Sequence, residues 1–163
     1  METFIHPTAV IYPNVKIGKG VYIGALCIIG APPESKTYFY SEDCPGVVIG
    51  DYAVITGNVT IDAGTVRETT IGKYSFIMKG VHIGHDAVIG YACTLSPHVK
   101  IGGHVEVGAY TNIGMGAAVH QRLYVPDRCM IGMNSTITKK TEMESNGVYV
   151  GSPAKFIRWN NRN

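Results

Sequence analysis

The sequence is poor in charge and has no long apolar run. Charged residues make up 16% of the 163 residues, whereas hydrophobic residues make up 45% and glycine stands at 20 positions. This balance disfavours a charged helical bundle or a disordered chain and favours a turn-rich, all-β protein with one core. The longest apolar stretch, Val21 to Ala31, is broken by two glycines and is shorter than a membrane span, which needs about 18 residues. We therefore expect no membrane insertion.

A secretion signal and cysteine motifs are also missing. The segment Met1 to Pro7 has no basic stretch followed by an apolar one, and the four cysteines show no CxxC spacing. Cys27, Cys93 and Cys129 share one phase of the repeat described below, where small inward-facing residues recur. We expect them to fill the core without a redox or zinc role, and we expect a cytoplasmic protein.

The net charge of +2 is too small to indicate nucleic-acid binding. The charge is unevenly distributed, because from Arg122 onward seven Lys and Arg residues face three acidic residues. A basic last third suits a phosphate-bearing ligand or an acidic partner, although an ordinary solvated surface explains it equally well.

An aliphatic residue recurs every six positions and is often followed by glycine. Such a short fixed period is typical of a solenoid, in which each unit buries its apolar face against its neighbours. The period fits a short strand plus a turn better than a helix. The repeat positions are Ile5, Ile11, Ile17, Ile23, Ile29, Ile49, Ile55, Ile61, Ile71, Ile77, Ile83, Ile89, Leu95, Ile101, Val107, Ile113, Val119, Val125, Ile131 and Ile137.

The six-residue repeat is interrupted twice and ends before the C-terminus. One interruption is a loop insertion at about 31–47, and the other adds four residues between Ile61 and Ile71. The pattern ends in a C-terminal tail at about 141–163. We expect one domain over 1–163, with the first insertion marking a binding face and the second equally explained as a harmless bulge.

These hexads resemble the left-handed parallel β-helix of the hexapeptide-repeat acyltransferases, in which three hexads form one triangular coil. Positions 18 apart would then stack at about 4.8 Å. This stacking places His85 beneath Gly103 and Gln121, Asp86 beneath His104 and Arg122, and Gly84 beneath Gly102 and His120. Four of the six histidines, His82, His85, His104 and His120, thus meet on one edge.

The residue types on this edge suit acyl transfer. His85 is the candidate general base, and the carboxylate of Asp86 would hold its tautomer. Gly103 has no side chain to shield its backbone N–H, which is the candidate donor to the oxyanion. No Ser or Cys nucleophile accompanies the cluster, so direct attack on a thioester is favoured over a covalent enzyme intermediate.

The same residues resemble the motifs of the UDP-N-acetylglucosamine acyltransferases of lipid A synthesis. The matching segments are Ile5-His6-Pro7-Thr8-Ala9, Gly30-Ala31-Pro32-Pro33, His82-Ile83-Gly84-His85-Asp86, Gly103-His104-Val105 and Gly116-Ala117-Ala118-Val119-His120-Gln121. The resemblance implies that His85, Asp86 and Gly103 are catalytic. It implies that His82, His104, His120 and Gln121 bind substrate. It also implies a nucleotide-sugar acceptor, acyl carrier protein as donor, and a homotrimer with sites between subunits.

Three departures separate this chain from that family. Glu34-Ser35-Lys36-Thr37 replaces a Gln-Asp-Leu-Lys stretch, and Asp62-Ala63-Gly64-Thr65 replaces a basic His-Arg-Gly-Thr stretch. The family's helical C-terminal domain is replaced by Gly151-Ser152-Pro153-Ala154-Lys155, which resembles the tail of coenzyme A-dependent sugar acetyltransferases. The donor is therefore acyl carrier protein or an acyl-coenzyme A, with Arg122, Lys155 and Arg158 as candidate donor contacts and no bound cofactor.

The sequence leaves three alternatives open. One is an acetyl-coenzyme A-dependent sugar acetyltransferase, and another is a non-catalytic scaffold, which needs no aligned histidines. The third is a zinc protein of the gamma carbonic anhydrase type. Its ligand spacing is absent, because Gly90 and Ala109 stand five residues after His85 and His104, and we expect no metal.

Overall fold

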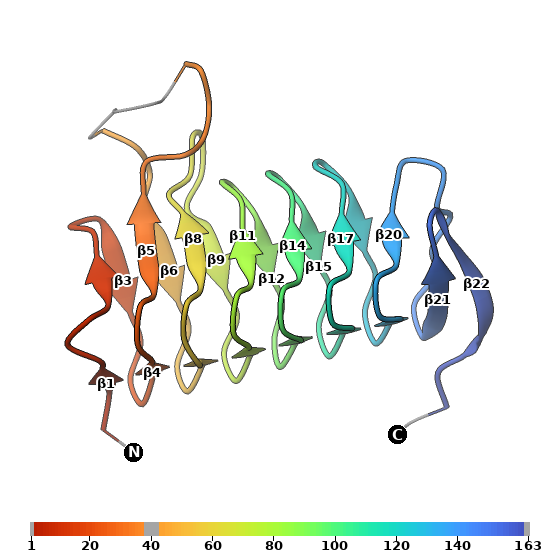
Figure 1. Cartoon of the computed structure of the whole chain (residues 1–163), viewed down its shortest axis with the longest axis horizontal. Coiled ribbons are helices and arrows are strands. Elements are labelled where there is room, and N and C mark those ends of the chain that lie inside the picture. The colour runs from red at the N-terminus through yellow and green to blue at the C-terminus, as the bar shows by residue number, and fades with distance from the viewer. Residues whose placement is uncertain (1, 38–42, 162–163) are drawn as a thin grey trace.

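The protein is a left-handed parallel β-helix, as the resemblance to the hexapeptide-repeat acyltransferases implied. The computed structural model describes residues 2–37 and 43–161, and these form 22 short strands. The coils stack along one axis, with the two termini at opposite ends (Figure 1). Within the described ranges no residue is helical, so no helix is present that could cross a membrane.

Three parallel sheets form the sides of the coil, each taking one strand per coil. The first sheet contains β1 (Phe4–Ile5), β4 (Tyr22–Ile23), β7 (Val54–Ile55), β10 (Phe76–Ile77), β13 (Thr94–Leu95), β16 (Asn112–Ile113), β19 (Met130–Ile131), β21 (Gly147–Gly151) and β22 (Ala154–Trp159). The second contains β2 (Val10–Ile11), β5 (Ile28–Ala31), β8 (Thr60–Asp62), β11 (His82–Ile83), β14 (Lys100–Ile101), β17 (Ala118–Val119) and β20 (Thr136–Ile137). The third contains β3 (Val15–Ile17), β6 (Val47–Ile49), β9 (Thr69–Ile71), β12 (Val88–Ile89), β15 (Glu106–Val107) and β18 (Tyr124–Val125).

The register between coils is the predicted 18-residue step. His82 pairs with Lys100, and Lys100 pairs in turn with Ala118. The same step relates β12 to β15 through Val88 and Glu106. Side chains far apart in the sequence are therefore stacked one above another on each face and corner of the coil.

The repeat aliphatics form the core. They are fully or almost fully buried from Ile23 to Ile137, whereas Ile5 is 41% exposed because it lies in the terminal coil, which has no coil beneath it. Each buried isoleucine contributes about 1.5–3 kcal/mol from the area removed from water. The cysteines behave as predicted, since Cys27, Cys93 and Cys129 are fully buried and carry free thiols.

Both insertions leave the coil at the same corner, between the second and third sheets. One connects β5 to β6 and the other, residues 63–68, connects β8 to β9, and in Figure 1 both rise from the upper edge. The ladder resumes after each, because Val15 pairs with Val47 and Val47 pairs with Thr69. The β11–β12 turn, which carries the His85-Asp86 pair, lies at this corner too.

The tail closes the end of the first sheet with an antiparallel hairpin. β21 lies parallel to β19, and β22 turns back onto β21 so that Val150 faces Lys155. The Tyr149 side chain is almost fully buried, and its hydroxyl accepts a hydrogen bond from the Glu144 backbone N–H at 2.6 Å. The hairpin thus covers the last coil and turns the exposed side chains of β22 outward.

Candidate active site

The β11–β12 turn brings a buried carboxylate against an imidazole. Asp86 is fully buried and has a left-handed backbone, with φ at 61°. Its Oδ2 lies 2.7 Å from His85 Nδ1, and its backbone N–H donates to Thr69 Oγ1 at 2.9 Å. The hydrogen bond to Thr69 therefore holds the Asp86 backbone, and the Asp86 carboxylate in turn holds the His85 ring.

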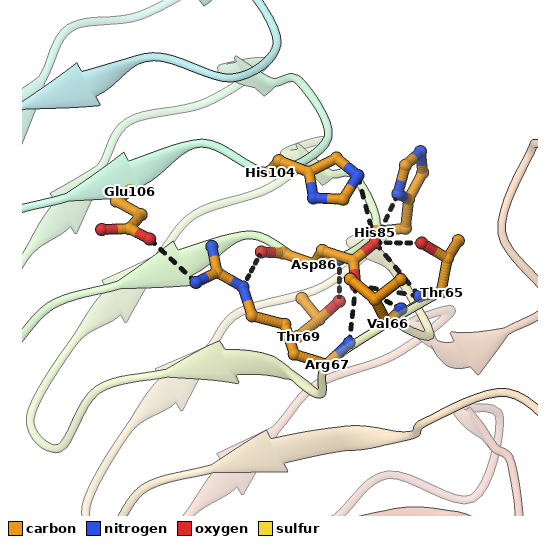
Figure 2. Close-up of polar contacts among 8 residues, drawn as sticks. All are labelled: Thr65, Val66, Arg67, Thr69, His85, Asp86, His104 and Glu106. Atoms are coloured by element: carbon orange, nitrogen blue, oxygen red, sulfur yellow. Dashed lines mark hydrogen bonds and ion pairs between the residues drawn. The ribbon is translucent and has the colours of Figure 1, made fainter.

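Residues 63–68, the second insertion, enclose Asp86 from below. Figure 2 shows Thr65, Val66 and Arg67 turned toward the carboxylate. The backbone N–H groups of these three residues donate to it at 2.8–3.1 Å, and the Thr65 hydroxyl donates at 2.7 Å. Burial acts to raise the pKa of Asp86, but the donors, led by Thr65, hold this pKa well below its ordinary value. Asp86 is thus an anion over the working pH range.

An ionised Asp86 determines the tautomer of His85. A carboxylate can only accept hydrogen bonds, so Nδ1 of His85 must carry the proton in the 2.7 Å contact. In the neutral ring, Nε2 then holds a free lone pair, and the side chain is 21% exposed. His85 is arranged to take a proton from a group bound outside the corner.

A second histidine reaches the same carboxylate. His104 Nε2 lies 3.5 Å from Asp86 Oδ2, and its ring meets that of His85 edge to face, with centroids 5.0 Å apart. Burial lowers the pKa of His104, and Arg122 and His85 add to this effect, although the Asp86 charge opposes it. His104 is therefore neutral at neutral pH and offers a hydrogen-bonding group rather than a charge.

Gly103 lies against the His85 ring. A Cβ at this position would stand 2.8 Å from both Cε1 and Nε2 of His85, so only glycine allows this approach. Among the described residues, no acceptor takes the Gly103 N–H, whereas its carbonyl accepts from the Arg122 N–H at 2.9 Å. A free backbone donor thus stands beside the candidate base.

A groove of about 500 Å³, the catalytic groove, runs along the second sheet past these groups. It brings together the predicted residues His82, His85, Gly103, His120 and Gln121. His82 is anchored by a 2.8 Å hydrogen bond between its Nδ1 and Thr60 Oγ1. His120 and Gln121 are exposed on its rim.

The predicted donor contacts are separated. Arg122 lies with His104 in a hollow of about 410 Å³ on the third-sheet side of the corner. Lys155 and Arg158 stand in β22, at the edge of the first sheet, and line neither hollow. Within one chain, the structure does not bring these two residues to the histidine edge.

Several site residues were missed by the sequence reasoning. The second insertion, read there as equally well a bulge, supplies Thr65 and Arg67 to Asp86, and the Arg67 guanidinium also pairs with Glu106 at 2.8 Å (Figure 2). Glu34 and Asp62, noted only as departures from a motif, line the catalytic groove. The sequence did contain a signal for Thr65 and Arg67, because the four extra residues lie about one coil before Asp86.

The His85, Asp86 and His104 side chains also resemble a metal-ligand set, since one ligand atom of each lies within 4.8 Å of the others. The Asp86 oxygens, however, already accept from the Thr65, Val66, Arg67 and His85 donors. A metal ion would have to displace these donors, so the chemistry of this set favours a hydrogen-bonded anion over a metal ligand.

Known proteins resemble this chain in sequence over most of its length. The bacterial transferase hexapeptide (six repeats) family model matches residues 2–31 and 68–103. The acyl-[acyl-carrier-protein]–UDP-N-acetylglucosamine O-acyltransferase of Pseudomonas putida (strain W619) is 34% identical, over 93% of this chain and 72% of that protein.

Solved structures agree with this comparison. LpxA, a UDP-N-acetylglucosamine acyltransferase from Bacteroides fragilis 9343, superimposes with a TM-score of 0.89 at 29% identity, covering 98% of this chain and 62% of that one. The UDP-N-acetylglucosamine O-acyltransferase of Moraxella catarrhalis RH4 gives a TM-score of 0.80 at 30% identity, covering 96% and 75%. This chain is therefore shorter than the proteins it matches.

Proposed function

Because the chain belongs to the hexapeptide-repeat acyltransferase family of the UDP-N-acetylglucosamine O-acyltransferases, we propose that it transfers an acyl group from a thioester to a hydroxyl or amine of a nucleotide-linked sugar. His85 is the general base in this proposal. The supporting observation is the arrangement of His85, whose Nδ1 is held at 2.7 Å by a buried, anionic Asp86 while Nε2 is free beside the Gly103 N–H.

The mechanism follows from this geometry. Nε2 of His85 takes the proton of the acceptor as the acceptor attacks the thioester carbonyl, and Asp86 stabilises the imidazolium that forms. The unshared N–H of Gly103 donates to the oxyanion of the tetrahedral intermediate. Collapse of the intermediate breaks the C–S bond, and the imidazolium returns its proton to the departing thiolate. His82, His104, His120 and Gln121 orient the substrates.

The donor is acyl carrier protein or an acyl-coenzyme A. The Pseudomonas putida relative is named for acyl carrier protein, an acidic partner suited to the basic last third of this chain. The exposed Lys155 side chain in β22 suits the phosphates of coenzyme A, and this favours an acetyl-coenzyme A-dependent sugar acetyltransferase as the second candidate.

We also propose a homotrimer with its sites between subunits. The catalytic groove lies open on the side of the coil, and a neighbouring coil would close it and exclude water. Light scattering coupled to size exclusion tests this assembly and is expected to give three times the mass of the chain.

Product mass tests the reaction. The protein is incubated with UDP-N-acetylglucosamine or UDP amino sugars, with acetyl-coenzyme A and a long-chain acyl carrier protein offered separately. We expect one acceptor to gain an acyl group with release of an equal amount of thiol. His85→Ala is expected to lose nearly all turnover and to keep its assembly state.

Two results would contradict the proposal. Turnover that persists in His85→Ala removes this residue as the base. Absence of both acyl product and thiol release with every pair supports a non-catalytic scaffold instead. Zinc retained by the purified protein at one ion per chain would support the carbonic anhydrase-like alternative.

A further inference from the structure

A second hollow adjoins the catalytic groove and is acidic. We name this hollow of about 360 Å³ the acidic pocket; it is lined by Glu34, Asp62, His82 and Thr60, with Tyr12 and Pro32 among its apolar residues. Glu34, Asp62 and His82 line the catalytic groove as well, so the two spaces adjoin each other at these side chains. Among the described residues lining the acidic pocket, none is Lys or Arg.

Asp62 is the unusual group in this pocket. Its side chain is only 10% exposed, and the Glu34 backbone N–H acts on it as a hydrogen-bond donor, but within residues 2–37 and 43–161 it makes no hydrogen bond to another side chain. The nearest cationic candidate is His82, whose Nε2 is 4.0 Å from Asp62 Oδ2, beyond hydrogen-bonding distance. A buried carboxylate is costly unless its charge is paired, and one backbone donor leaves most of its lone pairs open, so Asp62 can accept further donors from a ligand in the pocket.

The residues around Asp62 indicate the charge of the ligand group that would bind in the acidic pocket. Burial raises the pKa of Asp62, and the nearby Glu34 carboxylate adds to the increase, while His82, the Glu34 backbone N–H and His85 oppose it. The presence of two carboxylates disfavours a diphosphate here and favours a cation. A primary ammonium group is a compact cation with three N–H donors, which matches two carboxylates.

We propose that the acceptor is an amino sugar, that its free amino group binds Asp62 and Glu34, and that this amine is the acylated nucleophile. The proposal rests on the acyl-transfer function above and specifies its substrate class. A hydroxyl acceptor could also donate to Asp62, but it would leave both carboxylates uncompensated. The arrangement therefore discriminates between an amine and a hydroxyl at the same position of the sugar.

The protons and bonds of this acyl transfer balance with His85 as the only protein base. The bound ammonium first releases one proton to solvent, and the neutral amine then attacks the thioester carbonyl to form the C–N bond. The second N–H proton passes to Nε2 of His85, and the C–S bond breaks as the tetrahedral intermediate collapses. The thiolate takes the proton from His85. The products are an amide and a thiol, with one proton released to solvent.

Matched acceptors provide the test. UDP-N-acetylglucosamine is compared with analogues in which the hydroxyl at position 3, 4 or 6 of the sugar is replaced by an amino group, one at a time. We expect one amino analogue to exceed UDP-N-acetylglucosamine in kcat/KM by about 10- to 100-fold, the range expected for a charge-assisted hydrogen bond. Asp62→Asn should reduce this ratio by a similar factor, and Glu34→Gln, on an exposed residue, by less.

Controls separate selectivity from folding and from net charge. Asp51→Asn removes the same charge at the opposite side of the coil, where Asp51 pairs with Lys73, and should leave the ratio unchanged. If Asp62→Asn misfolds, Glu34→Gln still tests the pocket. Equal or better use of UDP-N-acetylglucosamine, or a ratio unchanged in both pocket variants, would overturn the inference while leaving acyl transfer intact.

A binding measurement distinguishes failure of the acyl-transfer proposal from failure of the amino-sugar inference. If no acceptor is acylated with any donor, the acyl-transfer proposal has failed, and calorimetry with the same nucleotide sugars then decides the inference. Tighter binding of an amino analogue that weakens in Asp62→Asn supports amine recognition. Equal binding of all the sugars refutes it.

Discussion

Replacing Asp86 with asparagine tests whether the buried anion organises the site. Asparagine keeps the shape but loses the charge, and its NH2 group must face either His85 or the N–H groups of residues 65–67. Hydrogen bonds to a charged group contribute about 1.5–3 kcal/mol each, and at least one of these would be lost. We expect the free energy of unfolding to fall by about 2–4 kcal/mol.

The expected catalytic effect is larger. Without the anion, His85 loses both its fixed tautomer and the stabilisation of its charged form, so kcat should fall by about 10²- to 10⁴-fold. KM for the sugar should change little, because Asp86 is fully buried and is not among the residues that line the catalytic groove. Initial rates and chemical denaturation at one protein concentration measure both quantities.

The pH dependence gives an independent check on the same variant. The pKa of Asp86 is below its ordinary value in the folded protein, so its stabilising contribution is complete above the unfolded pKa of about 3.9. That contribution is lost as the pH falls below this value and through the depressed pKa. The stability difference between the wild type and Asp86→Asn should therefore narrow as the pH is lowered from about 5 to about 3.

Thr65→Val is the matched control, because it removes only the hydroxyl donor at 2.7 Å from Asp86 Oδ2. It should cost about 1.5–3 kcal/mol and reduce kcat much less than Asp86→Asn does. The reasoning is refuted if Asp86→Asn keeps kcat within about tenfold of the wild type while its stability falls, since Asp86 would then be structural only.

Three further changes test the surroundings. Gly103→Ala places a methyl group 2.8 Å from the His85 ring and should lower kcat by about 10²-fold, with an unchanged elution volume; a fully active variant would contradict the contact. Ile101→Ala opens a cavity in the core and should cost about 2–5 kcal/mol in a denaturant titration, and a smaller loss would indicate that the coils collapse around it. Arg158→Ala should raise KM for the acyl donor while kcat is unchanged, and an unaltered KM would remove β22 from the donor site.

The fold was predictable because the repeat acts through burial alone. A six-residue period of aliphatic residues predicted a solenoid and the inward cysteines. The resemblance to hexapeptide-repeat proteins added three hexads per coil, and pairs such as His82 with Lys100 follow from that 18-residue step. The stacking also predicted that His85, Asp86, Gly103 and His104 would come together. These contacts follow from the six-residue period, which can be counted along the chain, together with the three-hexad coil that the resemblance supplied.

The cradle of Asp86 was not predictable in this way. Its donors are mostly backbone N–H groups of residues 65–67, which exist in every sequence and become a binding site only when the loop adopts one conformation. The role of Asp62 depended similarly on which side chains surround it in the groove. Lys155 and Arg158 were grouped with Arg122 by charge and by the resemblance of the tail to coenzyme A-dependent sugar acetyltransferases, although the hairpin places both residues at the edge of the first sheet.

Both insertions emerge at the corner that carries the histidines, and each is followed by a strand in normal register. The strand register therefore does not depend on how many residues connect two strands at this corner. A loop there can lengthen without shifting any core residue. Substrate preference and stability can then change independently, because the loop sequences at this corner can vary while the aliphatic residues of the core stay the same. A family built on this plan can diversify its acceptors through this one edge at little cost to its fold.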